Sequence, residues 1–397
     1  MRVSTANSFD ASVESLIKRQ TAMATAQEQL TTGKRVNRAS DDPAAAARAE
    51  RALAAETRTD ALQRAVNASQ NAMQLAESAL GDAGDLLQQI REAMVAAGNG
   101  SYSDLERRAQ ADKIAGLRTQ LLGVANRQDG AGNYLFGGQT PDRVPFVDAP
   151  GGVVYQGTAG QIDAAGDPLP LTVDGRAAWM SARTGNGVFL TQPQAGNSGQ
   201  AWIDTGRVTD PSQLTGSSYS IVFAEAGGVV TYSILQDGGP TAIAGEPYVP
   251  GRAIQIDGLT TTVSGAPADG DTFELAPSTA DLNIFDAIDR AVAELNTPLR
   301  NTSQIAQTNN AALAAVDGAM AQMQSVRAAV GDTLNRIDSA TGRLDDLRLS
   351  AQTDRSNAEG LDMVRAISDF QNKQTGYDAA LKSYSLVQKM SLFNYIT

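Results

Sequence analysis

The side chains available for chemistry in this chain are mainly carboxylates, because the sequence contains neither histidine nor cysteine. The absence of histidine removes the usual general base, the commonest metal ligand and any Ser-His or Cys-His mechanism. The absence of cysteine excludes disulfide bonds and thiolate metal sites. A carboxylate pair or a serine–lysine mechanism remains, and the sequence shows no constellation for either. We therefore expect no enzyme activity, no metal and no cofactor.

Two pairs of acids come nearest to a site. Asp41 and Asp42 precede Pro43, and Asp42 as N-cap with Pro43 at the first helical position predicts a helix start. The segment 269–271, Asp-Gly-Asp, is too short and too poor in further ligands for an EF-hand loop, so we interpret it as a turn. Glycine-rich stretches in this region do not follow a strand and open a helix, which excludes a phosphate-binding loop.

A long helix is the element around which the chain is organised. Apolar or small residues recur at alternating steps of four and three, a heptad pattern that predicts a left-handed coiled coil. They are Leu62, Val66, Ser69, Met73, Ala76, Leu80, Ala83, Leu87, Ile90 and Met94. The C-terminal part keeps almost the same rhythm at Val330, Leu334, Ile337, Thr341, Leu344, Leu347, Ala351 and Ala358. Both ends of the chain are therefore expected to fold together.

Other helix boundaries are also predicted. Ser103 and Glu106 form the pattern of a capping box. Asp281 is the expected N-cap of a helix whose apolar face begins at Ile284.

The residues between the helical ends differ in character. Glycine and proline become frequent, and β-rich runs at 219–223, 229–234 and 259–263 are separated by turn signals. The expected fold is α plus an inserted β domain: a long antiparallel helical bundle or coiled coil formed by both chain ends, with a β-rich middle domain. We place the terminal helices at 1–40 and 356–397, the long bundle at 41–140 and 278–355, and the β domain at 141–277.

The terminal helices carry apolar residues that a single subunit cannot fully bury, including an apolar C-terminus. We therefore predict that they form an assembly interface, with Phe9, Val13, Leu16, Met23, Leu30, Leu381, Tyr384, Val387, Met390, Leu392 and Phe393 as its residues.

Charge and hydropathy restrict the partners. The net charge of −12 and the sequence pI near 4.6 argue against nucleic acid and against an anionic membrane. The sequence has no signal-peptide pattern and no apolar run of membrane-spanning length. We expect a soluble protein.

Several motifs, in this order along the chain, resemble the flagellin superfamily and, within it, the hook-associated junction proteins. They are residues 2–5, 30–37, 39–43, 126–138, 265–273 and 391–395. The motif residues singled out are Asp41, Asp42, Pro43, Tyr134, Leu135, Phe136, Gly137 and Gly138. Residues 134–138 and the final residues suit a junction protein better than a filament flagellin.

The resemblance implies a structural adaptor between the hook and the flagellin filament, with the terminal helices in an inner tube. It implies four partners: the hook-side junction protein (the first hook-associated protein), flagellin, further copies of the chain in a ring, and an export chaperone before assembly. It also implies an extracellular place in the flagellum, reached through the flagellar type III secretion apparatus without a cleaved signal peptide. A filament-forming flagellin is the alternative.

Overall fold

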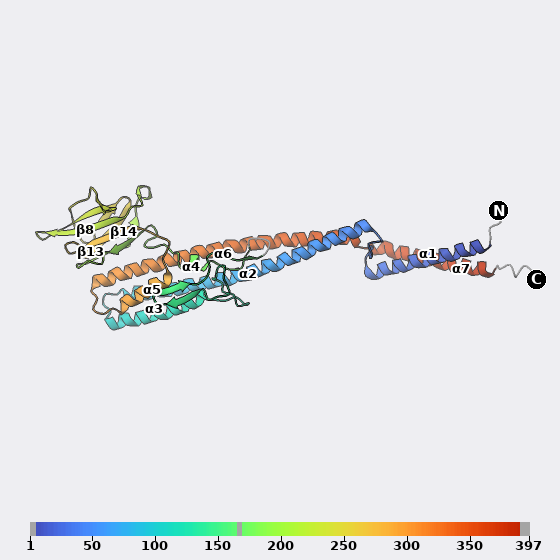
Figure 1. Cartoon of the computed structure of the whole chain (residues 1–397), viewed down its shortest axis with the longest axis horizontal. Helices are drawn as coiled ribbons and strands as arrows, with labels where there is room; N and C mark the ends of the chain where they lie inside the picture. Colours follow the sequence, from blue (N-terminus) through green and yellow to red (C-terminus); the bar gives the residue numbers. More distant parts are fainter. Residues whose placement is uncertain (1–4, 165–168, 390–397) are drawn as a thin grey trace, which may run out of the picture. The chain divides into compact units, whose positions relative to one another are not determined.

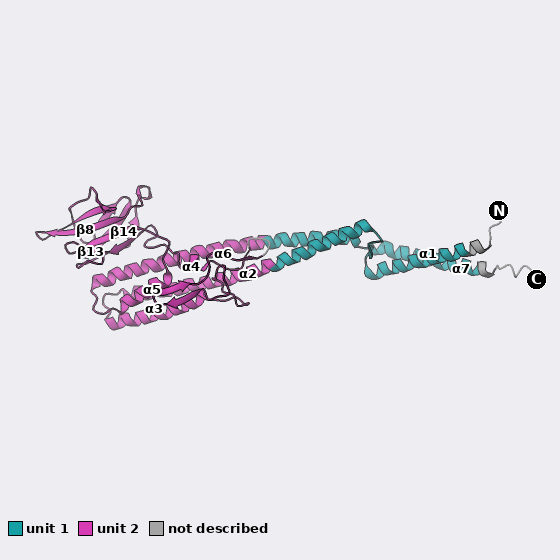
Figure 2. Cartoon of the chain, viewed as in Figure 1, with its two compact units in different colours: residues 1–64, 340–397 teal, residues 65–339 magenta. Residues whose placement is uncertain are grey.

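The computed structural model describes residues 5–164 and 169–389 (Figure 1). The chain divides into two compact units, residues 1–64 with 340–397 (unit 1) and residues 65–339 (unit 2) (Figure 2). Unit 1 thus combines segments from both ends of the chain, and unit 2 is the continuous segment between them. This is expected for an insertion between two helical ends.

Within the described residues, six helices make up the α-helical part. They are α1 (Thr5–Thr32), α2 (Pro43–Ala97), α3 (Asp104–Ala125), α5 (Ile284–Asn296), α6 (Thr302–Glu359) and α7 (Met363–Lys389). A short α4 (Gly175–Trp179) lies in the insertion. With 55 and 58 residues, α2 and α6 are far longer than an ordinary globular helix of about 12 residues. Helices of this length need partners along them.

The heptad predicted for α2 is confirmed. From Val66 to Met94 every predicted seam residue is buried, with at most 2% of its surface exposed, and Leu62 is half-buried. Ion pairs along the flank of the seam link α2 to α6 in unit 2, with Arg91 Nε 2.6 Å from Asp317 Oδ1.

The seam predicted for α6 is right at its seven-residue positions and wrong at Leu347. Val330, Ile337, Leu344 and Ala351 are buried, whereas the side chain of Leu347 is 58% exposed. A pair of helices buries only a narrow seam, and Leu347 falls on its flank.

The predicted helix starts are confirmed in two of three cases. Ser103 caps α3 with the reciprocal bonds of a capping box, and α2 begins at Pro43. Asp281 is not the N-cap of α5, because Asn283 takes that position. The reason is that Leu282 N–H donates to Ala182 O at 3.0 Å, which keeps residue 282 extended and delays the helix.

The described part of the insertion contains two larger sheets and two short strand pairs. One sheet has the order β10-β9-β8-β14-β5, with β11 beside β9; the other has the order β12-β13-β6, with β7 beside β13. The strands of the first are β5 (Phe189–Pro193), β8 (Tyr219–Ala226), β9 (Val229–Gln236), β10 (Gly239–Pro240), β11 (Glu246–Pro247) and β14 (Thr272–Pro277). Those of the second are β6 (Gln200–Ile203), β7 (Arg207–Val208), β12 (Ala253–Ile256) and β13 (Leu259–Ala266). The predicted β-rich runs lie in β8, β9 and β13.

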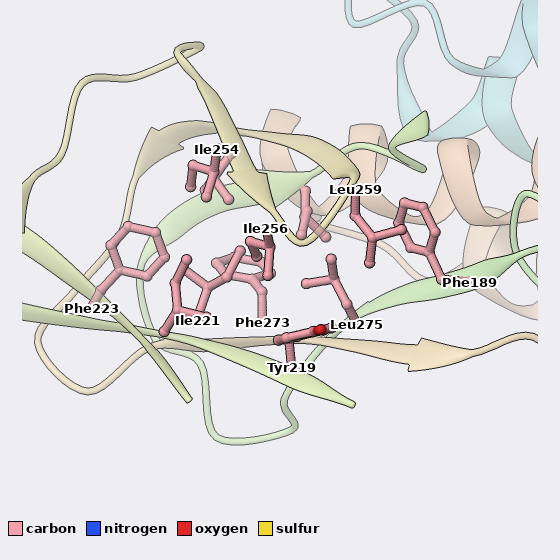
Figure 3. Packing of buried hydrophobic residues seen from close by; sticks show 12 residues of the cluster. Phe189, Tyr219, Ile221, Phe223, Ile254, Ile256, Leu259, Phe273 and Leu275 are labelled. Carbon is pink, nitrogen blue, oxygen red and sulfur yellow. The ribbon is translucent and has the colours of Figure 1, made fainter. Parts of the chain in front are cut away.

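The two larger sheets enclose one apolar core. Side chains of β8 and β14, such as Ile221 and Phe273, point toward Ile254 and Ile256 of β12 (Figure 3). All are almost fully buried. In β8 and β12 alternate residues face this core, which is the pattern of a sandwich. β13 instead buries three consecutive residues, 259–261. The predicted fold class, helical ends with an inserted β domain, is confirmed.

The short pairs precede the sandwich. β1 (Phe146–Ala149) pairs with β2 (Gly152–Tyr155), and β3 (Asp163–Ala164) pairs with β4 (Leu169–Pro170). In the part of the chain that the structure describes, no helix is both long and apolar enough to cross a membrane.

Candidate assembly interface

The terminal helices α1 and α7 pack against each other within unit 1 (Figure 2). Their contact buries little apolar surface. Between residues 10 and 32 of α1 only Ala26 is buried, and none of the described side chains from 363 to 386 of α7 is. Hydrophobic stabilisation scales with the apolar area removed from water, so this pair is weakly held within one subunit.

Of the predicted interface residues, Val13, Leu16, Met23, Leu30 and Tyr384 are half-buried and Leu381 is exposed. The side chains of Phe9 and Val387, and the whole of Met390, Leu392 and Phe393, lie outside the described residues. The role of all these residues in assembly stays a prediction.

Among the described side chains, the predicted interface omits five exposed apolar residues of the same helices: Ile17, Met363, Val364, Ile367 and Leu386. Ile17 is 58% exposed and Leu386 is 62% exposed. Each lies next to a residue of the predicted stripe, and a count of hydrophobic residues on both sides of the stripe could have found them. On α7, Val364 is 83% exposed, so apolar surface runs along most of its described length.

Asp41, Asp42 and Pro43 lie where α1 passes into α2. Asp42 caps α2, as predicted, since its Oδ1 accepts a hydrogen bond from Ala45 N–H at 3.0 Å. This bond is the main reason why the pKa of Asp42 is lowered. Asp41 instead accepts two backbone N–H groups of the preceding loop, at 3.1 and 2.9 Å. The acid pair therefore shapes a loop and a helix start.

That loop meets the place where α6 gives way to α7. Lys34 and Gly360 form an isolated antiparallel bridge, flanked by backbone hydrogen bonds of 2.7 and 3.1 Å between the two segments. We call residues 33–42 and 355–362 together the clasp.

Ion pairs reinforce the clasp. Arg355 Nη1 donates to Glu56 Oε2 of α2 at 2.6 Å, and its Nε donates to Glu359 Oε1 at 3.2 Å. Lys34 Nζ lies 3.0 Å from Glu359 Oε2. The side chains of Glu56 and Glu359 are only 12% and 16% exposed, so solvent screens these charges less than it screens surface pairs.

The motif Tyr134–Gly138 is part of the interior of unit 2. Leu135, Phe136, Gly137 and Gly138 are buried, and Tyr134 is half-buried. Gly138 has φ 62°, and a Cβ there would lie 1.9 Å from Thr158 O, so only glycine fits. In the described structure this motif is a packing element, and its side chains offer little free surface.

Phe136 of this motif packs into an aromatic cluster. Phe136 packs edge-on against Trp179 of α4 at 5.4 Å between ring centres. Trp179 stacks on Phe285 of α5 at 5.8 Å, and Phe146 of β1 lies 6.0 Å from the same ring. These contacts join the start of the insertion to the helical bundle.

Arg118 of α3 fastens the same region by charge. Its guanidinium donates to Asp148 Oδ2 and to Asp289 Oδ2, each at 2.8 Å, and lies over the ring of Phe285. The hydrogen bond with Arg118 lowers the pKa of Asp148, and the same bond raises the pKa of Arg118. Among residues 5–164 and 169–389, no three acidic side chains gather closely enough to hold a metal ion.

Comparison with known proteins places these features in a family. Residues 3–140 match the bacterial flagellin N-terminal helical region, and residues 313–396 match the bacterial flagellin C-terminal helical region. Residues 193–277, which contain most of the sandwich, match the D2-like domain of flagellar hook-associated protein 1.

Relatives that match most or all of the chain point to the same family. The chain is 25% identical to flagellar hook-associated protein 3 of Escherichia coli (strain K12) over 99% of both chains. It is 31% identical to the crystal structure of Xanthomonas campestris FlgL, with a TM-score of 0.69 over 78% of this chain and 99% of that one. It is 29% identical to the flagellar junction protein FlgL of Legionella pneumophila, with a TM-score of 0.64 over 70% of this chain and 94% of that one. The chain therefore belongs to the flagellar hook-associated protein 3 (FlgL) family of the flagellin superfamily.

Proposed function

We propose that this chain is a structural adaptor that joins the hook to the flagellin filament. The observation that carries the proposal is the exposed apolar surface of α1 and α7. It is combined with similarity to flagellar hook-associated protein 3 over 99% of the chain and to a flagellar junction protein over 70% of it. An adaptor needs exposed apolar surfaces that its neighbours cover on assembly, and α1 and α7 provide them. The hook-side junction protein and flagellin are the expected partners.

The subunits are proposed to form a ring. Identical subunits joined head to tail make heterologous contacts, which leave two different faces, one for each neighbour along the axis. Adjacent α1–α7 pairs would cover each other's exposed residues, including Ile17, Val364 and Leu386. In this arrangement 1–40 and 356–397 line the inner tube, 41–140 and 278–355 carry the shape, and 141–277 faces outward.

The proposed route to this place is export through the flagellar secretion apparatus without a cleaved signal peptide, with a chaperone holding α7 beforehand. The apolar residues of α7 are suitable for a chaperone, because they are exposed before assembly. A chain without cysteine also threads through a channel without disulfide bonds to undo.

A filament-forming flagellin is the second candidate, and the matches to both flagellin helical regions favour it. Against it stand the whole-length similarity to hook-associated protein 3 and the D2-like match in the sandwich. An enzyme is not proposed, since relatives over the whole chain are structural proteins of the flagellum.

The test is a clean deletion in the host, followed by electron microscopy of the cells and an assay of flagellin in the medium. We expect intact hooks without filaments and monomeric flagellin shed into the medium, because the exported filament subunits have nothing to build on. Loss of the bulk filament with no flagellin shed would favour the second candidate. Normal filaments would contradict both.

A further inference from the structure

The terminal helix pair has a defined register that its own seam does not explain. The bridge between Lys34 and Gly360 joins the chain just after α1 to the chain just before α7. From this bridge α1 and α7 run antiparallel. Sixteen residues beyond Gly360, a Cβ at Gly376 of α7 would lie 2.8 Å from Nη1 of Arg19, which is 15 residues before Lys34. One antiparallel register therefore holds from residue 34 back to residue 19.

The seam between α1 and α7 is too weak to select that register. Ala26 is the one buried residue among the described side chains of the two helices, and Val13, Leu16, Met23 and Leu30 of α1 are only half-buried. A seam whose larger apolar residues are only partly buried fits almost as well after a slip of seven residues, because few large side chains interlock. Such a slip moves one helix by about 10 Å along the other.

The axial alignment of α2 with α6 does not determine the alignment of α1 with α7. Along the N-terminal segment, 22 residues separate Lys34 from Glu56, whereas five separate Gly360 from Arg355, the partner of Glu56. The loop before α2 breaks the continuity of helix periodicity. Whatever sets the register of the terminal pair must therefore lie at the clasp.

We propose that the clasp sets the axial register of α1 against α7, with Arg355 as the positioning residue. Arg35 and Arg355 each bond in two directions. Arg35 donates to Asp42 Oδ2 and to Ala358 O, each at 3.0 Å, and so joins the two clasp segments to each other. Arg355 connects the clasp to α2, because it donates to Glu56 as well as to Glu359 at the end of α6. Glu359 in turn pairs with Lys34, which follows α1. A planar guanidinium with several donors fixes two carboxylates in direction as well as distance. Arg355 therefore keeps the α1–α2 break and the α6–α7 break at the same position along the helix axis.

The inference deepens the proposed function and rests on it in one respect: the register matters where neighbouring α1–α7 pairs must present matching apolar surfaces. Unit 2 does not need it. Loss of Arg355 should therefore disturb the terminal pair and leave the bundle of unit 2 unchanged.

The absence of cysteine allows a direct reading of the register. In the deletion strain we would express Arg19→Cys/Gly376→Cys and, as the out-of-register pair, Arg19→Cys/Ser383→Cys, one heptad further along α7. Flagella are sheared, treated with a short bis-maleimide and immunoblotted for the internally cross-linked chain. With the clasp intact, we expect the 19–376 product to exceed the 19–383 product at least tenfold.

Added to each pair, Arg355→Gln should lower the 19–376 product severalfold and raise the 19–383 product. Arg355→Lys should keep only part of the 19–376 product, because it retains the charge but lacks the planar group that bonds both carboxylates. Arg327→Gln is the matched control, since Arg327 makes an ion pair with Glu77 of 2.5 Å between α6 and α2 in unit 2, away from the clasp, and should leave the ratio unchanged.

An unchanged ratio in Arg355→Gln, or an equal change in Arg327→Gln, would overturn the inference. Absence of the clasp-intact cysteine pairs from sheared flagella would count against the proposed function instead. If those pairs or only the Arg355→Gln chains are absent, the same ratio is read on the purified full-length chain. There, too, a ratio insensitive to Arg355→Gln would overturn the register-setting role.

Discussion

At the scale of single residues, Arg118 and its two carboxylates show how the insertion is fastened to the bundle. The guanidinium is 11% exposed and meets Asp148 of the insertion and Asp289 of α5. We expect Asp148→Asn to lower the free energy of unfolding by roughly 1 kcal/mol at pH 7, because half of the Asp148 side chain remains in solvent. Chemical denaturation monitored by Trp fluorescence would measure it, with Trp179 next to this contact.

The pH dependence of the same contact has a definite sign. The pKa of Asp148 is lowered in the folded protein by its hydrogen bond with Arg118, so its contribution is complete above the ordinary carboxyl range near pH 4 and is lost as the pH falls through the lowered value. Asp148→Asn should therefore flatten the loss of stability below about pH 4. Asp142→Asn, which removes an exposed carboxylate 4.0 Å from Arg143, is the control, and an equal flattening there would refute the assignment.

At the scale of elements, α7 is the helix whose apolar residues gain most from assembly. We expect Val387→Asp, and deletion of 389–397, to abolish filament growth while the thermal unfolding of unit 2 stays unchanged, because α7 belongs to unit 1. Motility, electron microscopy and circular dichroism of the purified variants measure this. Val229→Asp, at an exposed position next to the β8–β9 turn, is the matched control and should swim. Filaments on the truncated protein would show that the terminal helices are not the interface.

At the scale of the whole molecule, the sandwich should be separable from assembly. The chain enters and leaves it at one place, where Thr184 N–H donates to Thr279 O at 2.9 Å. Deleting 187–277 and closing the gap with a short glycine linker should keep the helical content of the rest and still support filaments. A deletion that begins at 145 would also remove Phe146 and Trp179, which pack on α5, and should destabilise the bundle.

Two measurements check this deletion. Helical content is read by circular dichroism, and filament growth by electron microscopy of the complemented deletion strain. A folded and exported deletion variant that leaves the cells without filaments would mean that the sandwich itself makes contacts required for assembly.

Heptad spacing by itself determined the long seam of α2, because a seven-residue apolar repeat is stable only when a partner helix covers it. The end caps at Ser103 and Asp42, the β-rich insertion and the family motifs could be predicted for the same kind of reason, since each depends on neighbouring residues alone. Local sequence could not decide the N-cap of α5, because a bridge between Ala182 and Leu282 keeps the chain extended past Asp281. It also could not decide that Leu347 lies exposed on the flank of the seam.

The tertiary structure alone decided which distant residues meet. Arg355 faces Glu56 across 299 positions, and Arg118 reaches Asp289 across 171. It also showed that Tyr134–Gly138 packs inside unit 2, where the sequence indicated only a family motif. Spacing along a helix reports which face of the helix a residue occupies. The residue that meets this face depends on the path by which the chain folds back, and periodicity carries no information about that path.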